Sequence, residues 1–250
     1  WLYSEECYTG WNTLPQHRHL WKLDEIYVSG PLTYRYSFAD SNCNTFIRGF
    51  NTPAEATRLF EYLTSGVMKY VDWTNIKATG SMIDACVIKR NITGATGVLD
   101  PVYLKWIDTY FCRCKHDSIP VYNYPVADIK PMKVSQDVKV EYFTDLDIMV
   151  NTRDEEVYEE KAKEIYAAVV KACEGSENVK LSSIVKPKSI KWRIEIHGVL
   201  RIDMFRMSEC GYVGFHLPPV RGCYDGKQFT LATSMIMAGI SGTSLDYRWM

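Results

Sequence analysis

Two stretches of alternating apolar residues carry aspartates, and they constrain the fold more than any other feature of the chain. Residues 142–150 hold Asp145 and Asp147, and residues 199–205 hold Asp203. Because residues i and i+2 of a strand point to one face, the first two acids project together, and Asp203 can join them from a neighbouring strand. Three carboxylates on one face repel one another unless a divalent cation lies between them. Mg²⁺ is commonly held by carboxylates and substrate phosphates, so the pattern indicates metal-dependent phosphoryl chemistry.

Each half of this pattern also has an ordinary structural interpretation. A single aspartate at the end of a strand is usually a turn or solvated residue, and a pair spaced like Asp145 and Asp147 is common in proteins. The third acid, in a separate apolar stretch, is what favours a functional interpretation.

Composition and charge limit the class of protein. The 250 residues suffice for one large or two small domains, and 46% apolar with 24% charged residues is ordinary for a soluble globular protein. No run of 18 apolar residues or signal peptide is present, so we expect no membrane association. A net charge of −1 excludes a globally basic nucleic-acid binder but not a local basic face. The eight scattered cysteines favour a reducing, intracellular compartment. The chain lacks an initiator Met, and we expect a processed or truncated fragment.

Local patterns predict strands and helices along most of the chain. Thr52, Pro53 and Glu55 form a strong helix start, because Thr caps, Pro suits the first turn and Glu completes a capping box. A second confident helix has Val157, Ile165, Val169 and Cys173 on one stripe and Gly175 as its stop. The helices are expected at 53–71, from 82 to 87, at 153–173 and at 234–240. The strands are expected at 26–28, 32–38, 45–47, 75–79, 142–150, 180–185, 190–196, 199–206 and 212–217.

The order of these elements resembles the nucleotidyltransferase fold of DNA polymerase beta and poly(A) polymerases. Members carry a Gly-Ser or Gly-Gly turn, an acid-x-acid strand and a third acid on a later strand. The matching positions here are Gly80, Ser81, Asp145, Asp147 and Asp203. The sequence from Ile194 to Asp203 also resembles nucleotidyltransferase-like proteins of large DNA viruses, so a viral factory or virion is one expected location beside the cytoplasm.

The resemblance implies an α+β fold, a mixed sheet with flanking helices and a large insertion. It predicts a β-rich segment at 1–50, the nucleotidyltransferase-like core at 51–206, and a C-terminal segment at 207–250. Ser81 and Asp145 are 64 positions apart, further than in the family, so an insertion at about 88–140 must loop out. The cost of closing a loop grows slowly with its length, so the fold can tolerate this insertion.

The resemblance also implies a site and a reaction. Asp145, Asp147 and Asp203 would hold Mg²⁺ or Mn²⁺, and Gly80 with Ser81 would hold the triphosphate. Lys191 and Arg193 would add positive charge for the nucleotide. The implied reaction moves a nucleotidyl group from an NTP to a hydroxyl, such as an RNA 3′ end. Two rivals remain: an inactive scaffold or assembly subunit, in a homo- or hetero-oligomer, and a metal-dependent nuclease.

Other candidate motifs have competing structural interpretations. The basic run at Lys186, Lys188, Lys191 and Arg193, with Trp192 for stacking, could contact RNA or other nucleic acid, or simply protect a strand edge. A zinc site is not indicated at Cys112, Cys114 and His116, because their spacing matches no known pattern and the sequence shows no second ligand pair. His197 is expected in a hairpin turn, and Arg221 and Asp225 in a glycine-rich loop.

Overall fold

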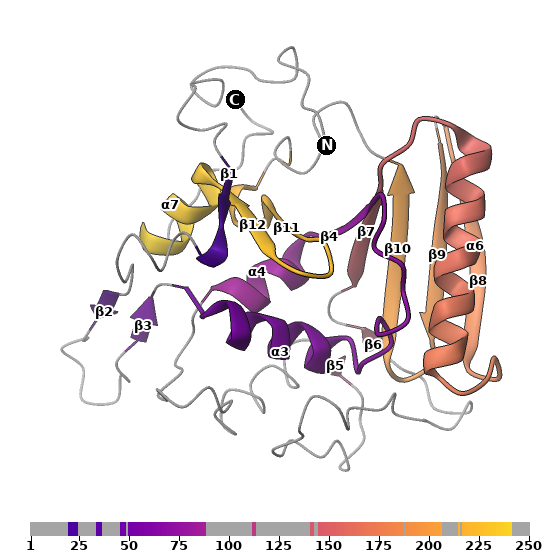
Figure 1. The fold of residues 1–250 in the computed structure, drawn as a ribbon, viewed down its shortest axis with the longest axis horizontal. Coiled ribbons are helices and arrows are strands. Elements are labelled where there is room, and N and C mark those ends of the chain that lie inside the picture. The colour runs from indigo at the N-terminus through magenta and orange to yellow at the C-terminus, as the bar shows by residue number, and fades with distance from the viewer. Residues whose placement is uncertain are drawn as a thin grey trace.

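The computed structural model describes the side chains of residues 20–24, 50–88, 145–187, 190–206, 215 and 217–239. For residues 34–36, 46–48, 112–113, 141–142, 189 and 240–241 it describes the backbone alone. Together these residues form an α+β fold around one large mixed sheet (Figure 1).

The large sheet has eight strands in the order β1-β12-β11-β4-β7-β10-β9-β8. The strands are β1 (Leu20–Lys22), β12 (Phe229–Ala232), β11 (Gly222–Tyr224), β4 (Ile76–Thr79), β7 (Leu146–Val150), β10 (Leu200–Arg206), β9 (Ser189–Ile196) and β8 (Val179–Lys186). Only β7 and β10 pair in parallel, and the other neighbours are antiparallel. Two small sheets pair β2 (Tyr34–Tyr36) with β3 (Phe46–Arg48), and β5 (Cys112–Arg113) with β6 (Glu141–Tyr142). The large sheet therefore contains strands from all three predicted segments, 1–50, 51–206 and 207–250.

Four described helices cover one face of the large sheet. They are α3 (Pro53–Leu63), α4 (Ser81–Val87), α6 (Glu155–Ala172) and α7 (Thr233–Ser241), with a short 3₁₀ turn, η5 (Pro218–Val220). Helix α6 packs on β8 and β9, whereas α4 packs on β4, β7 and β11 and carries α3 (Figure 1). Within the described residues, no helix is long and apolar enough to cross a membrane.

The core lies between these helices and the apolar face of the sheet. Leu146, Ile148 and Val150 of β7 alternate toward it, as do Ile202 and Met204 of β10. Because strand residues alternate between faces, the residues between them point away from the helices. The opposite face therefore carries the aspartates, together with a second, small apolar cluster around Met149 and Cys223. This alternation separates the polar face from the main core.

Helix α3 starts where the capping box predicted, but it ends earlier. Thr52 accepts from the Glu55 amide and the Glu55 carboxylate accepts from the Thr52 amide, which confirms the predicted start. The helix stops at Leu63 rather than at residue 71, because Ser65 and Gly66 both adopt positive φ, 51° and 68°. Two consecutive left-handed residues cannot continue a right-handed helix.

The stripe predicted for α6 is wrong at its first position. Val157 is 50% exposed, and Tyr158 is the buried residue of that turn. The buried stripe continues through Ala162, Ile165 and Val169, at helical spacing from Tyr158. The C-terminal stop is confirmed, although the left-handed residue with φ 57° is Glu174.

Three strand predictions also need correction. The expected strand 142–150 is divided: β6 ends at Tyr142, and β7 begins at Leu146, after Asp145. The segment described as a glycine-rich loop, around Arg221, contains the hairpin β11–β12, which the sequence pattern missed. No strand occurs at Phe215 or Leu217, and residues 212–214 lie outside the described part. The expected strand 26–28 also lies outside it.

Candidate functional site

Asp147 and Asp203 lie side by side on the face of the sheet that the helices leave free. They are direct register partners in the parallel pair β7–β10. Strands in a sheet are about 4.8 Å apart, so the two carboxylates share one small region. Asp203 is also the partner of Arg193 in β9, and Asp147 the partner of Thr79 in β4. A row of four polar side chains thus crosses four strands.

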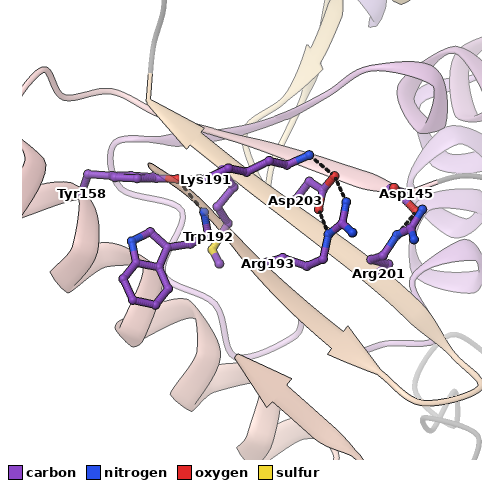
Figure 2. Close-up of polar contacts among 8 residues, drawn as sticks. Asp145, Tyr158, Lys191, Trp192, Arg193, Arg201 and Asp203 are labelled. Atoms are coloured by element: carbon purple, nitrogen blue, oxygen red, sulfur yellow. Dashed lines mark hydrogen bonds and ion pairs between the residues drawn. The ribbon is translucent and has the colours of Figure 1, made fainter. Parts of the chain in front are cut away.

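Asp145 joins this region through an arginine that the sequence interpretation missed. The Nε atom of Arg201 donates to Oδ1 of Asp145 over 2.7 Å (Figure 2). Arg201 lies two residues before Asp203 in β10, so both side chains are on one face. The same i, i+2 rule that grouped the acids would have placed Arg201 beside them.

Asp203 is held by two cations from β9. Arg193 donates from Nε to Oδ1 over 2.6 Å and from Nη2 to Oδ2 over 2.9 Å, and the Lys191 ammonium also contacts Oδ2 (Figure 2). A two-point arginine–carboxylate contact of this kind is strong and directional. Only 4% of the Asp203 side chain is exposed. Burial alone would raise the pKa of Asp203, but the hydrogen bonds from Arg193 and Lys191 outweigh it and hold the pKa below its ordinary value.

Asp147 is in the opposite electrostatic situation. No hydrogen bond or ion pair joins its carboxylate to another described residue. Burial, and then the charge of Asp203 beside it, raise the pKa of Asp147 to about 6. The charges of Lys191 and Arg193 reduce this effect but do not cancel it. Asp147 is therefore the acid of the site that lacks a compensating partner, as expected of a group kept for a ligand.

The turn after β4 approaches Asp147 closely. Gly80 has φ +87°, and a Cβ atom at this position would lie 2.5 Å from Oδ2 of Asp147. Glycine is therefore required both by backbone geometry and by space. The preceding Thr79 is buried, and its hydroxyl oxygen has no hydrogen-bond partner among the described groups. Ser81 follows as the exposed first residue of α4. The predicted Gly-Ser turn and the second acid of the pair are thus neighbours.

The donor set suits a hard divalent cation, but its present arrangement does not enclose one. Within the described residues, no group of three or more His, Cys, Asp or Glu side chains is placed to hold a metal ion. The oxygens of Asp145 and Asp203 instead face Arg201, Arg193 and Lys191 (Figure 2). Carboxylate oxygens are nevertheless the ligands that Mg²⁺ and Mn²⁺ prefer, and Gly80 approaches Oδ2 of Asp147 without placing a side chain against it.

Several other predicted residues lie away from this cluster. The Trp192 side chain is partly buried and packs against the main core, on the opposite face from Lys191 and Arg193. Its role in stacking on nucleic acid stays a prediction. Lys186 is exposed at the end of β8, and His197 is in the β9–β10 turn as expected. Arg221 is buried and donates to the Phe215 carbonyl and the Ser234 hydroxyl, so it is a structural residue. Lys188, Cys114 and His116 lie outside the described residues, as does the Cys112 side chain.

Comparison of the chain with protein-family models, with curated proteins and with solved structures gives no match. The function is therefore inferred from the geometry and charge of the acidic site.

Proposed function

We propose that this protein is a Mg²⁺- or Mn²⁺-dependent nucleotidyltransferase that moves a nucleotidyl group from an NTP to a hydroxyl. The observation that carries the proposal is the register pair of Asp147 and Asp203, beside the Gly80 turn. An acid from each of two parallel strands, next to a glycine with no room for a side chain, provides carboxylates and backbone for a metal–triphosphate ligand.

Each residue of the site has a distinct task in this proposal. Asp145, Asp147 and Asp203 would hold the metal, which when bound lowers the pKa of the attacking hydroxyl and neutralises phosphate charge. Gly80 and Ser81 would lie against the triphosphate. Lys191, Arg193 and Arg201, once released from the carboxylates, would bind phosphate oxygens as charge-assisted donors.

The transfer balances without any further reactant. The acceptor oxygen forms a bond to the α-phosphorus, and the bond from that phosphorus to the bridging oxygen breaks. Pyrophosphate leaves with the electron pair, and the hydroxyl proton passes to solvent. An RNA 3′ end is the acceptor that we propose to test first, in line with the resemblance to poly(A) polymerases.

The test is extension of a labelled oligoribonucleotide with each of the four NTPs, in Mg²⁺ or Mn²⁺. We expect wild-type protein to lengthen the RNA, and Asp147→Asn to reduce extension by about 10³-fold, because transition-state charge is no longer stabilised. The variant should remain folded. The matched control is Glu160→Gln, which neutralises an exposed acid on α6 and should leave extension unchanged. Shortening of the RNA would indicate a metal-dependent nuclease instead. Full activity of Asp147→Asn would show that the aspartates do not take part in the reaction.

A second candidate function is a non-catalytic scaffold or assembly subunit with the same fold. It is favoured by one observation: Asp145 and Asp203 are already neutralised by Arg201, Arg193 and Lys191 without any metal. Ion pairs of this kind can stabilise the fold without any role in catalysis. The scaffold predicts that wild-type protein neither extends nor shortens RNA and that Mn²⁺ does not change its unfolding temperature.

A further inference from the structure

The strands that carry Asp203 and its two cations separate beside the site. The β9–β10 register runs from Leu200↔Ile196 to Met204↔Trp192 and stops there. Beyond this pair, β9 remains paired with β8 as far as Ser189, and β10 remains paired with β7 as far as Arg206. The sheet therefore forks between β9 and β10, one residue after Asp203.

The hydroxyl of Tyr158 occupies the apex of this fork. The Trp192 amide donates to the Tyr158 oxygen over 3.0 Å (Figure 2). The Tyr158 hydroxyl in turn donates to the Met204 carbonyl over 2.6 Å. These are the two residues of the last register pair. Tyr158 reaches them from α6, on the apolar side of the sheet, where its side chain is fully buried. One side-chain oxygen thus joins both strands where they part.

The fork determines where Lys191 can go. Lys191 lies just beyond the last paired residue of β9, where β10 offers it no register partner. Its ammonium instead reaches back to Oδ2 of Asp203, beside the Arg193 contact (Figure 2). Trp192 lies between Lys191 and Arg193 in the chain, so a contact that fixes the Trp192 backbone also fixes the backbone of both cationic residues.

We propose that Tyr158 is a positioning residue for the acidic site: its hydroxyl fixes the β9–β10 fork and so sets Lys191 and Arg193 on Asp203. The proposal rests on the proposed function where it concerns catalysis, but the placement of Lys191 is independent of any reaction. Without the hydroxyl, the Trp192 N–H and the Met204 carbonyl lose a shared partner in a buried place. Buried groups seldom remain unpaired, so the strands must shift to find new partners. A shift there moves Lys191 relative to Asp203.

The test compares Tyr158→Phe with Tyr166→Phe. Tyr166 lies two turns further along α6, and its hydroxyl donates to the Val179 carbonyl over 3.4 Å, away from the fork. Both variants remove one hydroxyl from the same helix. The first readout is the rate at which an amine-reactive ester acylates Lys191, measured by mass spectrometry relative to exposed Lys180. We expect Tyr158→Phe to raise the relative rate roughly tenfold, since losing one hydrogen bond is worth about that factor, and Tyr166→Phe to leave it unchanged.

The second readout is transfer kinetics. Misplacement by about 1 Å can cost about a hundredfold in rate, so we expect kcat to fall by roughly that factor in Tyr158→Phe. KM for the NTP should rise as well, because Lys191 and Arg193, which bind phosphate oxygens in the proposed function, would be displaced together. Equal acylation rates of Lys191 in the two variants would overturn the proposal. If the wild-type protein is active, equal kcat values in Tyr158→Phe and Tyr166→Phe would overturn it too. A wild type without transfer activity would reject the proposed function alone, and the acylation result would still decide the role of Tyr158.

Loss of folding in Tyr158→Phe would not prevent the comparison. Trimethylamine N-oxide favours the compact state, and both variants can be acylated in the same concentration of it. Folded Tyr158→Phe with wild-type Lys191 reactivity under these conditions would overturn the proposal, and raised reactivity would support it.

Discussion

At the residue scale, Asp147 and Asp203 differ although they lie side by side. Asp203 is paired with two cations, which hold its pKa below the ordinary range despite its burial. Asp147 is half-buried next to that charge without a partner, and its pKa is raised to about 6. One carboxylate therefore stabilises the fold at neutral pH and the other destabilises it. The unpaired acid is the better candidate for a ligand-binding group.

This difference predicts a pH dependence of stability in metal-free protein. Between pH 4 and pH 6 the unfolded state loses the Asp147 proton while the folded state keeps it, so stability falls as pH rises. Above pH 6 the full cost applies, at most about 3 kcal/mol for a shift from 3.8 to about 6. Asp147→Asn should match wild type near pH 4 and exceed it at pH 7 by up to that amount. Urea unfolding in EDTA at both pH values measures the difference.

The control for this prediction is Asp203→Asn. Its carboxylate has a lowered pKa, so its contribution to stability is present at neutral pH and is lost as pH falls through the folded pKa. Asp203→Asn should therefore be less stable than wild type at pH 7, the opposite of Asp147→Asn. A loss of stability in both variants at pH 7 would contradict the assignment of Asp147 as the uncompensated acid.

At the element scale, helix α6 links the stability of the fold to the acidic site. Asp154 caps the helix, with Oδ1 accepting from the amides of Glu156 and Val157 over 2.8 and 3.1 Å. The first helical bond runs from the Tyr158 amide to the Asp154 carbonyl, so the cap holds the turn that presents Tyr158 to the fork. The helix start and the position of the tyrosine are set by the same few residues.

We expect Asp154→Ala to cost about 1 kcal/mol in the free energy of unfolding, because two helix amides lose their acceptor. Asp154→Asn should retain most of the stability, since an amide oxygen can cap equally well. Urea unfolding of the two variants gives both values. Equal losses in the two variants would show that the charge, rather than the capping oxygen, stabilises the helix.

At the scale of the whole molecule, the charges of the site balance internally. Three carboxylates (Asp145, Asp147 and Asp203) face three cations (Lys191, Arg193 and Arg201), so their formal charges sum to zero when all are ionised. A divalent cation alone would leave an excess of positive charge, and a triphosphate alone would leave an excess of negative charge. Metal and triphosphate together supply charges of opposite sign, so we expect them to bind together.

This balance predicts strong coupling between metal and nucleotide. A non-hydrolysable NTP should bind about 10- to 100-fold more tightly with Mg²⁺ than without it, within the usual range of coupling between two ligands. The same factor should appear in the Mg²⁺ affinity with and without the nucleotide, because the coupling is reciprocal. Isothermal titration calorimetry at constant ionic strength measures both. Independent binding of Mg²⁺ and the nucleotide would contradict the proposal that Lys191, Arg193 and Arg201 leave the carboxylates to bind phosphate oxygens.

Much of the fold around the site could be predicted from sequence because it depends on short-range patterns. The capping box at Thr52 fixed the start of α3, and alternation placed Asp147 and Asp203 on strands with one polar face. Patterns failed where a tertiary partner decides. The short strands β11 and β12 are stabilised by their neighbours in the sheet, and Tyr158 is buried because α6 packs on β8 and β9.

The sequence by itself determined that Asp147 and Asp203 lie on strands, because the spacing of side chains along a strand is a property of the backbone. Only the tertiary structure decided their surroundings. The parallel pairing of β7 and β10 put Asp203 beside Asp147, and the neighbouring β9 placed Arg193 and Lys191 on Asp203. Charge compensation acts through space between segments far apart in the chain, so no local pattern specifies which acid is paired and which is left for a ligand.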